Sequence, residues 1–416
     1  MKSARSVISV FFPLDEQLEL VPGMLTPLMH EREVRLGVWM PFGRSVVEMK
    51  WFCGIDVSKS QVRRATERAG AEYVTMQTVE AERLAQMPMG LKAPDTPELL
   101  SLTVDGAMVS LVGGGWAEVK TMVISEIATN SDSPSDSQKD KEVHSTNHSY
   151  FSRMIEAKDY VQEALVETER RGISHSKQVC AVTDGAEWIQ NFVSAHRPDA
   201  IRILDFYHAA EHLAEVGRKL YGEDSLEFKV WYVQQRHELR HGDPKKVLNE
   251  LHKMAKQDQL SDSLKSVIEA CIHYFESRLT MIQYATFSAL GYPVGSGVGE
   301  ACHKYVIQQR MKQAGMHWAK ANVNPMVALR NMACNDRWDE GMRQLVHWHH
   351  KQARLKFAAK HTKRLAESTA LTPAQPKSTH PSLLPPDFKL KPATPWCDQP
   401  IGKAKLNSAL RQSSAK

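Results

Sequence analysis

Hydrophobic residues alternate with small or polar residues over positions 100–127, a spacing that predicts β-strands. This segment, LSLTVDGAMVSLVGGGWAEVKTMVISEI, is rich in β-branched residues, and its three consecutive glycines at 113–115 predict a hairpin turn. We expect a meander of three strands, with Asp105 in the middle or late part of the first. The alternative is that Asp105 and Gly106 themselves form a turn.

The pattern changes after this meander to helices and short buried strands in alternation. Residues 128–150 are polar and rich in Ser, Asp and Asn, which predicts a long surface loop. A helix is expected over 154–171, followed by the strand QVCAVTD, a helix, the strand IRILDF and a further helix. This order predicts an α/β fold with the meander at one edge of the sheet.

Residues 225–285 carry helical periodicity without any strand pattern. We expect helices over 226–240, 244–256 and 260–284, forming an all-α block after the α/β segment. Another helical region is predicted over 324–350.

The N-terminal region predicts two helices joined by a short turn. Residues 45–52 form the first, Gly54 ends it, Ser58 caps the next, and 59–69 form the second. This outline fits a helix-turn-helix, whose second helix enters the major groove of DNA, or else a simple helical hairpin. The second helix directs three basic residues outward: Arg63, Arg64 and Arg68.

Composition and charge limit the classes of protein that the chain can represent. With 416 residues the chain is long enough for two or three domains. Its six cysteines include no CxxC pair, and its N-terminal apolar run is too short for a signal peptide or a membrane span, so we expect a soluble protein of the cytoplasm. The net charge is +5, and residues 351–416 alone carry 13 Lys and Arg against 3 Asp and Glu. We expect this basic, proline-rich tail to be disordered and either to bind a polyanion or only to aid solubility.

Three acidic residues are candidates for chemistry. Asp105 lies on the first strand, Asp184 ends a later strand, and Glu300 follows the glycine-rich run of residues 291–299. Carboxylate oxygens are the ligands that Mg²⁺ prefers, and two such ions can stabilise both the attacking and the leaving oxygen of a phosphodiester displacement. The simpler alternatives are a capping box of Asp184 with Glu187 and an ion pair of Glu300 with Lys304.

Several longer motifs resemble those of bacterial insertion-sequence transposases of the Kra type, relatives of the Mutator group of DDE transposases. The motifs are FFPLDEQLEL (11–20), VRLGVWMPF (34–42), VDGA (104–107), VTDGAEWI (182–189), ILDFYHAAEHL (203–213) and GYPVGSGVGEACHKYVIQQRMKQAGMHW (291–318). The resemblance implies an RNase H-like catalytic core, a mixed five-stranded sheet with helices, interrupted by an all-α insertion. It further implies that Asp105, Asp184 and Glu300 bind two Mg²⁺ or Mn²⁺ ions, and that Asp205 and His208 match an auxiliary DxxH element.

The resemblance also implies a function and a domain organisation. The protein is expected to cleave DNA at the terminal inverted repeats of an insertion sequence and to join the ends to target DNA, as a nucleoid-associated homo-oligomer without a membrane partner. The expected divisions are a helical domain (1–95), the first part of the core (96–222), the insertion (223–290), the end of the core (291–350) and the tail (351–416).

Other readings of the same residues remain open. Lys304, Arg310 and Lys312 are candidates for contacts with DNA phosphates or belong to a solvated face. The segment HAAEH matches a zinc-peptidase pattern in which His208 and His212 are ligands, Glu211 is the base, and Glu276 or Glu300 is the third ligand. A truncated, inactive derivative would bind DNA without cleaving it.

Overall fold

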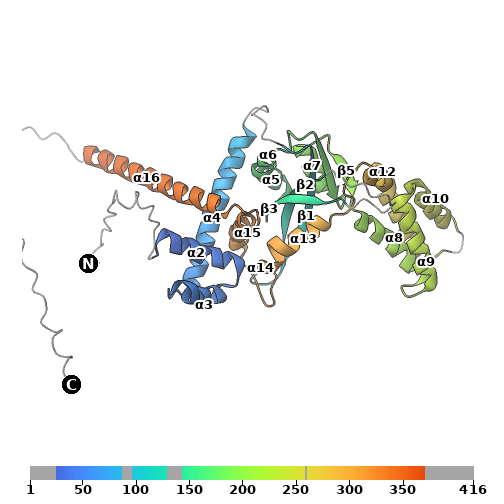
Figure 1. Ribbon diagram of the computed structural model, residues 1–416, viewed down its shortest axis with the longest axis horizontal. Coiled ribbons are helices and arrows are strands. Elements are labelled where there is room, and N and C mark those ends of the chain that lie inside the picture. Colours follow the sequence, from blue (N-terminus) through green and yellow to red (C-terminus); the bar gives the residue numbers. More distant parts are fainter. Residues whose placement is uncertain (1–24, 87–95, 129–142, 258–259, 371–416) are drawn as a thin grey trace, which may run out of the picture. The chain divides into compact units, whose positions relative to one another are not determined.

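The computed structural model describes residues 25–86, 96–128, 143–257 and 260–370. The chain divides into two compact units, Met1–Lys356 and Phe357–Lys416. The first unit has an α/β core with a mixed five-stranded open sheet (Figure 1). The motif at 11–20 and the part of the predicted tail beyond residue 370 lie outside the described residues. The disorder predicted from residue 351 is wrong for 351–370, which form the end of helix α16 (Trp338–Ala370), because the first proline of the tail is Pro373.

The sheet has the strand order β3-β2-β1-β4-β5. Its strands are β1 (Leu99–Ser110), β2 (Trp116–Ile127), β3 (Ser145–Arg153), β4 (Gln178–Thr183) and β5 (Ile201–Leu204). The first three are antiparallel, whereas β4 runs parallel to β1, and β5 runs parallel to β4. The hairpin at Gly113–Gly115 is confirmed, and all three glycines have positive φ.

Two strand predictions need correction. The apolar segment 100–127 forms two strands rather than three, because each strand is 12 residues long. The third strand is β3, which begins within the predicted loop of residues 128–150 and continues to Arg153. The strand was not predicted because its first residues are polar. Its last three residues, Phe151, Ser152 and Arg153, are buried against the neighbouring elements.

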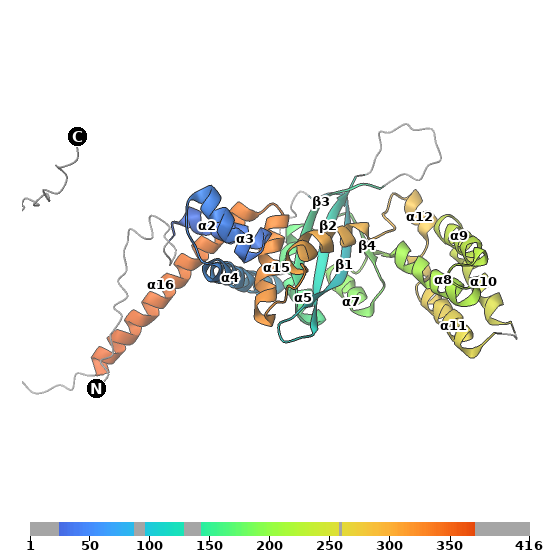
Figure 2. The same cartoon turned by 90° about the horizontal axis from the view of Figure 1, so that it is seen from below.

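Helices cover both faces of the sheet (Figure 2). Even-numbered β1 residues such as Leu100 and Leu102 pack with Tyr160 of α5 (Ala157–Glu163) and Phe192 of α7 (Glu187–His196). The odd-numbered Val109 packs instead with residues of the other layer. That layer contains α13 (Gly297–Cys302), the π-helical segment η2 (His303–Gln308), α14 (Gln309–Met311) and α15 (Lys320–Cys334). The strand period of two therefore separates the two cores.

Helix α8 (Phe206–Tyr221) follows β5, and the all-α block predicted after it is confirmed by five helical segments. They are α9 (Leu226–His241), α10 (Pro244–Ala255), α11 (Asp262–Glu276), η1 (Leu279–Met281) and α12 (Tyr284–Ala289). Side-chain caps at Ser225, Asp243 and Ser261 start α9, α10 and α11. The single helix predicted over 260–284 is wrong, because α11 ends at Glu276 and the chain turns before α12.

The predicted pair of N-terminal helices is present as α3 (Phe42–Cys53) and α4 (Lys59–Ala85), and both are longer than expected. A further helix, α2 (Pro27–Trp39), precedes them. Gly54 ends α3 with a φ of 67°, and the Ser58 side chain accepts a hydrogen bond from the Gln61 N–H at 3.1 Å. Helix α4 packs closely on α15, because a Cβ on Gly70 would lie only 2.3 Å from the Pro325 carbonyl oxygen. These helices therefore share a core with the end of the chain's first unit.

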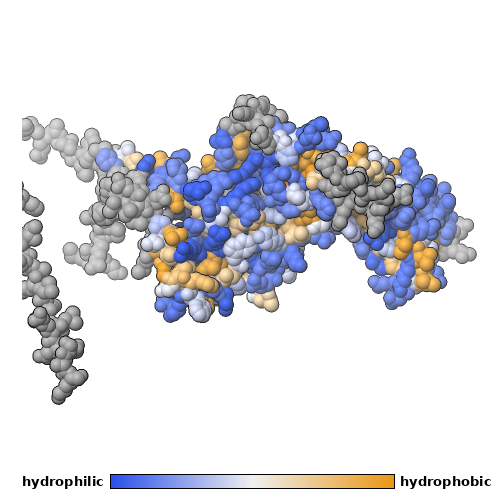
Figure 3. Space-filling view, in the orientation of Figure 1, coloured by the Kyte–Doolittle hydropathy of each residue, from blue (hydrophilic) through white to orange (hydrophobic). Residues whose placement is uncertain are grey.

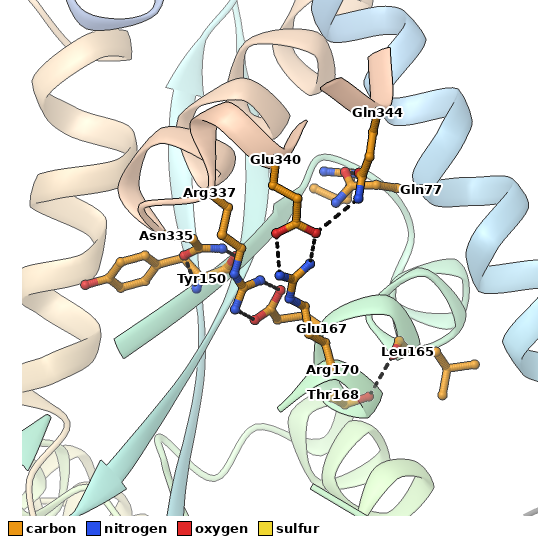
Figure 4. Close-up of polar contacts among 11 residues, drawn as sticks. Gln77, Tyr150, Leu165, Glu167, Thr168, Arg170, Asn335, Arg337, Glu340 and Gln344 are labelled. Carbon is orange, nitrogen blue, oxygen red and sulfur yellow. Dashed lines mark hydrogen bonds and ion pairs between the residues drawn. The ribbon is translucent and has the colours of Figure 1, made fainter. Parts of the chain in front are cut away.

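Two bidentate ion pairs hold α6 (Leu165–Arg170) against the start of α16 (Trp338–Ala370), as Figure 4 shows. Arg337 donates to Glu167 at 2.7 and 3.0 Å, and Arg170 donates to Glu340 at 2.8 and 2.6 Å. The helix predicted over 154–171 is divided into α5 and α6. The region 324–350 is likewise divided, and Asp336 at the break has a φ of 54°.

Within the described residues, no helix combines the length and the apolar character that crossing a membrane requires.

Candidate functional site

Three aspartates lie at the same level of the sheet, with Asp105 within β1, Asp184 directly after β4 and Asp205 directly after β5. The last register pair of β1 and β4 joins Leu102 to Ala181. Asp105 and Asp184 each lie three residues further along. Asp205 lies one residue beyond the pair of Thr183 with Leu204, and its N–H donates to the Thr183 carbonyl at 2.7 Å. In open sheets with parallel strands, sites form at such carboxyl ends.

Asp105 interacts closely with His303, which lies three residues after Glu300. The Asp105 Oδ2 atom lies 3.1 Å from His303 Nε2, and its Oδ1 atom accepts the Gly106 N–H at 2.7 Å. Burial alone would raise the pKa of Asp105, but these hydrogen bonds and the nearby charges of His303 and His208 lower it. The carboxyl group is therefore held in its ionised form.

Asp184 lies in a tight turn between β4 and α7. Its Oδ1 atom accepts the Ala186 N–H at 2.8 Å, while the N-cap position of α7 belongs to Ala186. The predicted capping box with Glu187 is thus absent from α7. The Tyr274 hydroxyl of α11 donates to the Asp184 carbonyl at 3.0 Å, so the helical block braces this turn.

Asp205 is buried and connects two parts of the site. Its Oδ1 atom caps α8 by accepting the His208 N–H at 2.9 Å, and its Oδ2 atom accepts the Ser296 N–H. The next residue, Phe206, donates its N–H to the Val294 carbonyl at 2.9 Å. Asp205 therefore fixes the loop that leads into the Glu300 helix.

Glu300 is exposed on α13, a helix that packs on the Asp105 side of the sheet. A Cβ on Gly299 would lie 2.9 Å from Thr103 Cγ2, and His303 contacts Asp105. Glu300 lies between these two contacts in the sequence. Among the ion pairs of the described residues, the alternative pair of Glu300 with Lys304 does not occur.

The chemistry of these acids suits a hard divalent cation, but their side chains do not surround one position. Within the ranges that the structure describes, no group of three His, Cys, Asp or Glu side chains lies in an arrangement that could hold a metal ion. Asp105 Oδ2 faces His303, and both oxygens of Asp205 accept backbone N–H groups. Ligation by the predicted triad would need Asp105 Oδ2 to leave His303.

The HAAEH segment occupies the first turns of α8. The Glu211 carboxylate pairs with Arg218, and the His212 ring lies against Tyr274 with centroids 3.9 Å apart. Glu276, one candidate for the third zinc ligand, instead bonds His252 at 3.0 Å. These partners do not favour the zinc reading.

The predicted DNA contacts divide into exposed and buried residues. The exposed ones are Arg63, Arg64, Arg68, Lys304 and Lys312. Arg310 is buried, with its guanidinium 4.8 Å from the Phe42 ring centroid and 5.0 Å from that of Trp318. Burial lowers the pKa of Arg310 to about 10, and its Nε atom donates to the Gly37 carbonyl at 3.0 Å. The expected phosphate contact at Arg310 is therefore corrected to a structural role.

His303 and Tyr274 are the site residues that the sequence patterns did not predict. The spacing of His303 from Glu300 would have placed both on one side of a helix. Tyr274 carried no such signal, because its contact with Asp184 joins segments 90 residues apart.

In comparisons with known proteins, no protein-family model matches the chain, and no curated protein matches its sequence.

Proposed function

We propose that the protein is a DNA transposase that cleaves DNA at the ends of an insertion sequence and joins the freed 3′-hydroxyl to target DNA. The proposal is carried by the common level of Asp105, Asp184 and Asp205 on or directly after three adjacent strands, with the Glu300 helix packed over Asp105. The strand order, with three antiparallel strands followed by two parallel ones, supports an RNase H-like core. We further propose that the protein acts on DNA as a homo-oligomer.

Asp105, Asp184 and Glu300 are the residues that would hold two Mg²⁺ or Mn²⁺ ions. Such ions would supply activation of the attacking oxygen and stabilisation of the leaving oxygen. Asp105 suits this role because its lowered pKa keeps it ionised.

The remaining residues position the acids. Asp205 holds the Ser296 backbone and so sets where α13 begins. His208 is exposed on the first turn of α8, and its charge acts on Asp105. This position suits a contact with the scissile strand.

The contact of His303 with Asp105 favours a second candidate, a DNA-binding derivative that does not cleave. His303 Nε2 lies within hydrogen-bond distance of Asp105 Oδ2, so this oxygen is not free to bind a cation. If that contact persists on DNA, the protein binds element ends without nicking them.

The experiment is a cleavage assay on duplexes that carry the element ends, with Mg²⁺ or Mn²⁺. Asp105→Asn, Asp184→Asn and Glu300→Gln should each abolish nicking, while binding of the same duplex measured by fluorescence anisotropy stays unchanged. Glu269→Gln is the matched control, because Glu269 is exposed on α11 and forms no ion pair in the described part of the chain.

The outcomes separate the two candidates. Nicking by the wild type that is lost in the three variants supports the transposase. Binding without nicking by the wild type supports the derivative, and wild-type nicking in any one variant removes that residue from the triad.

A further inference from the structure

A groove lies between helix α9 and the loop that precedes the Glu300 helix. It has a volume of about 810 Å³. We call it the α9 groove and define it by its main lining residues, which are Phe206, Tyr207, Val233, Arg236, Arg240 and Gly295. Phe206 directly follows the buried Asp205, and Gly297 and Val298 at the other wall precede Glu300, so the groove adjoins the acid cluster.

The lining of the groove is basic. Arg236 and Arg240 lie one turn apart on α9, accompanied by His237, and no Asp or Glu is among the lining residues that the structure describes. The guanidinium carbons of the two arginines lie 5.6 and 5.4 Å from the Phe206 ring centroid. Neither arginine forms an ion pair in the described part of the chain. Among the described residues, no carboxylate therefore neutralises these two neighbouring cations.

One atom in this cluster needs a hydrogen-bond acceptor. Arg240 Nη1 is buried and has no partner among the described residues. A buried donor without an acceptor costs about 1–3 kcal/mol, and more for a charged group. An anionic ligand would satisfy this atom once the Arg240 side chain turns outward into the groove, and guanidinium groups bind phosphate oxygens in pairs.

The groove also offers surfaces on which a base could stack. Tyr207 is 61% exposed, and a Cβ on Gly295 would lie 3.2 Å from its ring, so the ring lies along the loop. Val233 is 64% exposed, and together with Leu226 and Val230 it forms an apolar stripe on α9 that is visible in Figure 3. A small anion needs no such surface, and a duplex keeps its base faces stacked. Aromatic and apolar surface beside arginines is typical of sites for single strands.

We propose that the α9 groove binds a single-stranded segment of nucleic acid next to the acid cluster, with its phosphates on Arg236 and Arg240 and a base on Tyr207. This inference rests on the proposed function in taking the strand to be DNA. Its test is binding without a divalent ion, so that its failure and a failure of cleavage can be told apart.

The experiment uses the full chain in EDTA and a fluorescently labelled single strand of about 16 nucleotides. Arg236→Ala combined with Arg240→Ala should raise the Kd at least about tenfold and lower the slope of log K against log salt by about 1.4, the value for two lost phosphate contacts. Lys245→Ala combined with Lys265→Ala removes the same charge from exposed positions on α10 and α11 and should leave the Kd within about twofold.

Two further variants address folding and stacking. Arg236→Lys combined with Arg240→Lys keeps the charge and should restore most of the binding. Tyr207→Ala should weaken binding, whereas Tyr207→Phe, which keeps the ring, should not. The same alanine variants should change duplex binding by less than about twofold.

Unchanged single-strand binding in the double arginine variant would overturn the inference, and so would an equal loss on duplex and single strand. If the wild type does not nick DNA but the arginine variant still loses single-strand binding, the proposed function fails alone. If the wild type nicks DNA but the groove variants bind normally, the inference fails alone.

Discussion

Asp105 and Asp184 occupy equivalent positions on two adjacent parallel strands, each three residues beyond the register pair of Leu102 with Ala181. The two acids are nevertheless held differently. Asp105 lies within a strand and pairs with Thr121 of β2, whereas Asp184 follows the end of β4 and precedes Gly185, whose φ is 78°. The sheet fixes the backbone of Asp105, while the turn and Tyr274 fix that of Asp184.

Replacing His303 by Ala should weaken the pH dependence of stability that Asp105 gives the wild type. Because the folded-state pKa of Asp105 is lowered, its contribution is present above the unfolded-state pKa of about 3.9 and is lost as the pH falls through the lower folded-state value. The variant loses the hydrogen bond that lowers this pKa. We expect its unfolding free energy to be about 1–3 kcal/mol below the wild type near pH 5–6, with a difference that shrinks below about pH 3.5.

Urea denaturation over a pH series measures this difference. His303→Gln, whose amide can still donate to Asp105, is the matched control and should lose less. A deficit of the Ala variant that stays constant down to the lowest pH would contradict the assigned coupling.

Replacing Asp205 by Ala should destabilise the protein strongly. The change removes the α8 cap and leaves the Ser296 N–H without its acceptor, a combined loss of about 2–4 kcal/mol. Asp205→Asn retains one acceptor oxygen and should cost less. Chemical denaturation provides the measurement, and a loss below about 0.5 kcal/mol for the Ala variant would show that Asp205 does not anchor the loop.

Replacing Gly70 by Ala should force α4 away from α15. The new Cβ would lie 2.3 Å from the Pro325 carbonyl oxygen, and overpacking of this kind costs about 1–3 kcal/mol. The control is Gly43→Ala on α3, where a Cβ meets nothing within 4 Å among the described residues and should leave stability equal or slightly higher. Thermal unfolding of the pair tests the packing, and equal melting temperatures would contradict it.

Replacing Arg310 by Met and Lys312 by Ala should affect different properties. Arg310 is buried between two aromatic rings, so its loss should lower stability. Lys312 is exposed, so its loss should leave stability unchanged and can weaken only binding. Denaturation combined with anisotropy on duplex DNA separates the two effects. If the Arg310→Met variant is as stable as the wild type but binds DNA more weakly, Arg310 contacts DNA rather than supporting the fold.

Local patterns were sufficient for the features that depend on neighbouring residues. Four features were predicted correctly: the hairpin glycines, the Ser58 cap, the helix end at Gly54 and the all-α block. Turns, caps and amphipathic periods depend on residues close together in the sequence. The same reasoning failed for β3, whose polar residues are buried by partners distant in the sequence. Asn331, for example, accepts a hydrogen bond from the Ser152 hydroxyl.

The sequence by itself determined the α/β class, the β1–β2 hairpin, the alternation of β4 and β5 with helices, and the position of Asp184 at the end of a strand. Only the tertiary structure decided that Asp105 faces His303, that Asp205 anchors the loop before Glu300, and that Arg310 is buried. The physical reason is the separation of the partners. Periodicity shows which face of a helix or strand is apolar. The hydrogen-bond partner of a buried polar group depends instead on which distant segment packs against it in the folded chain.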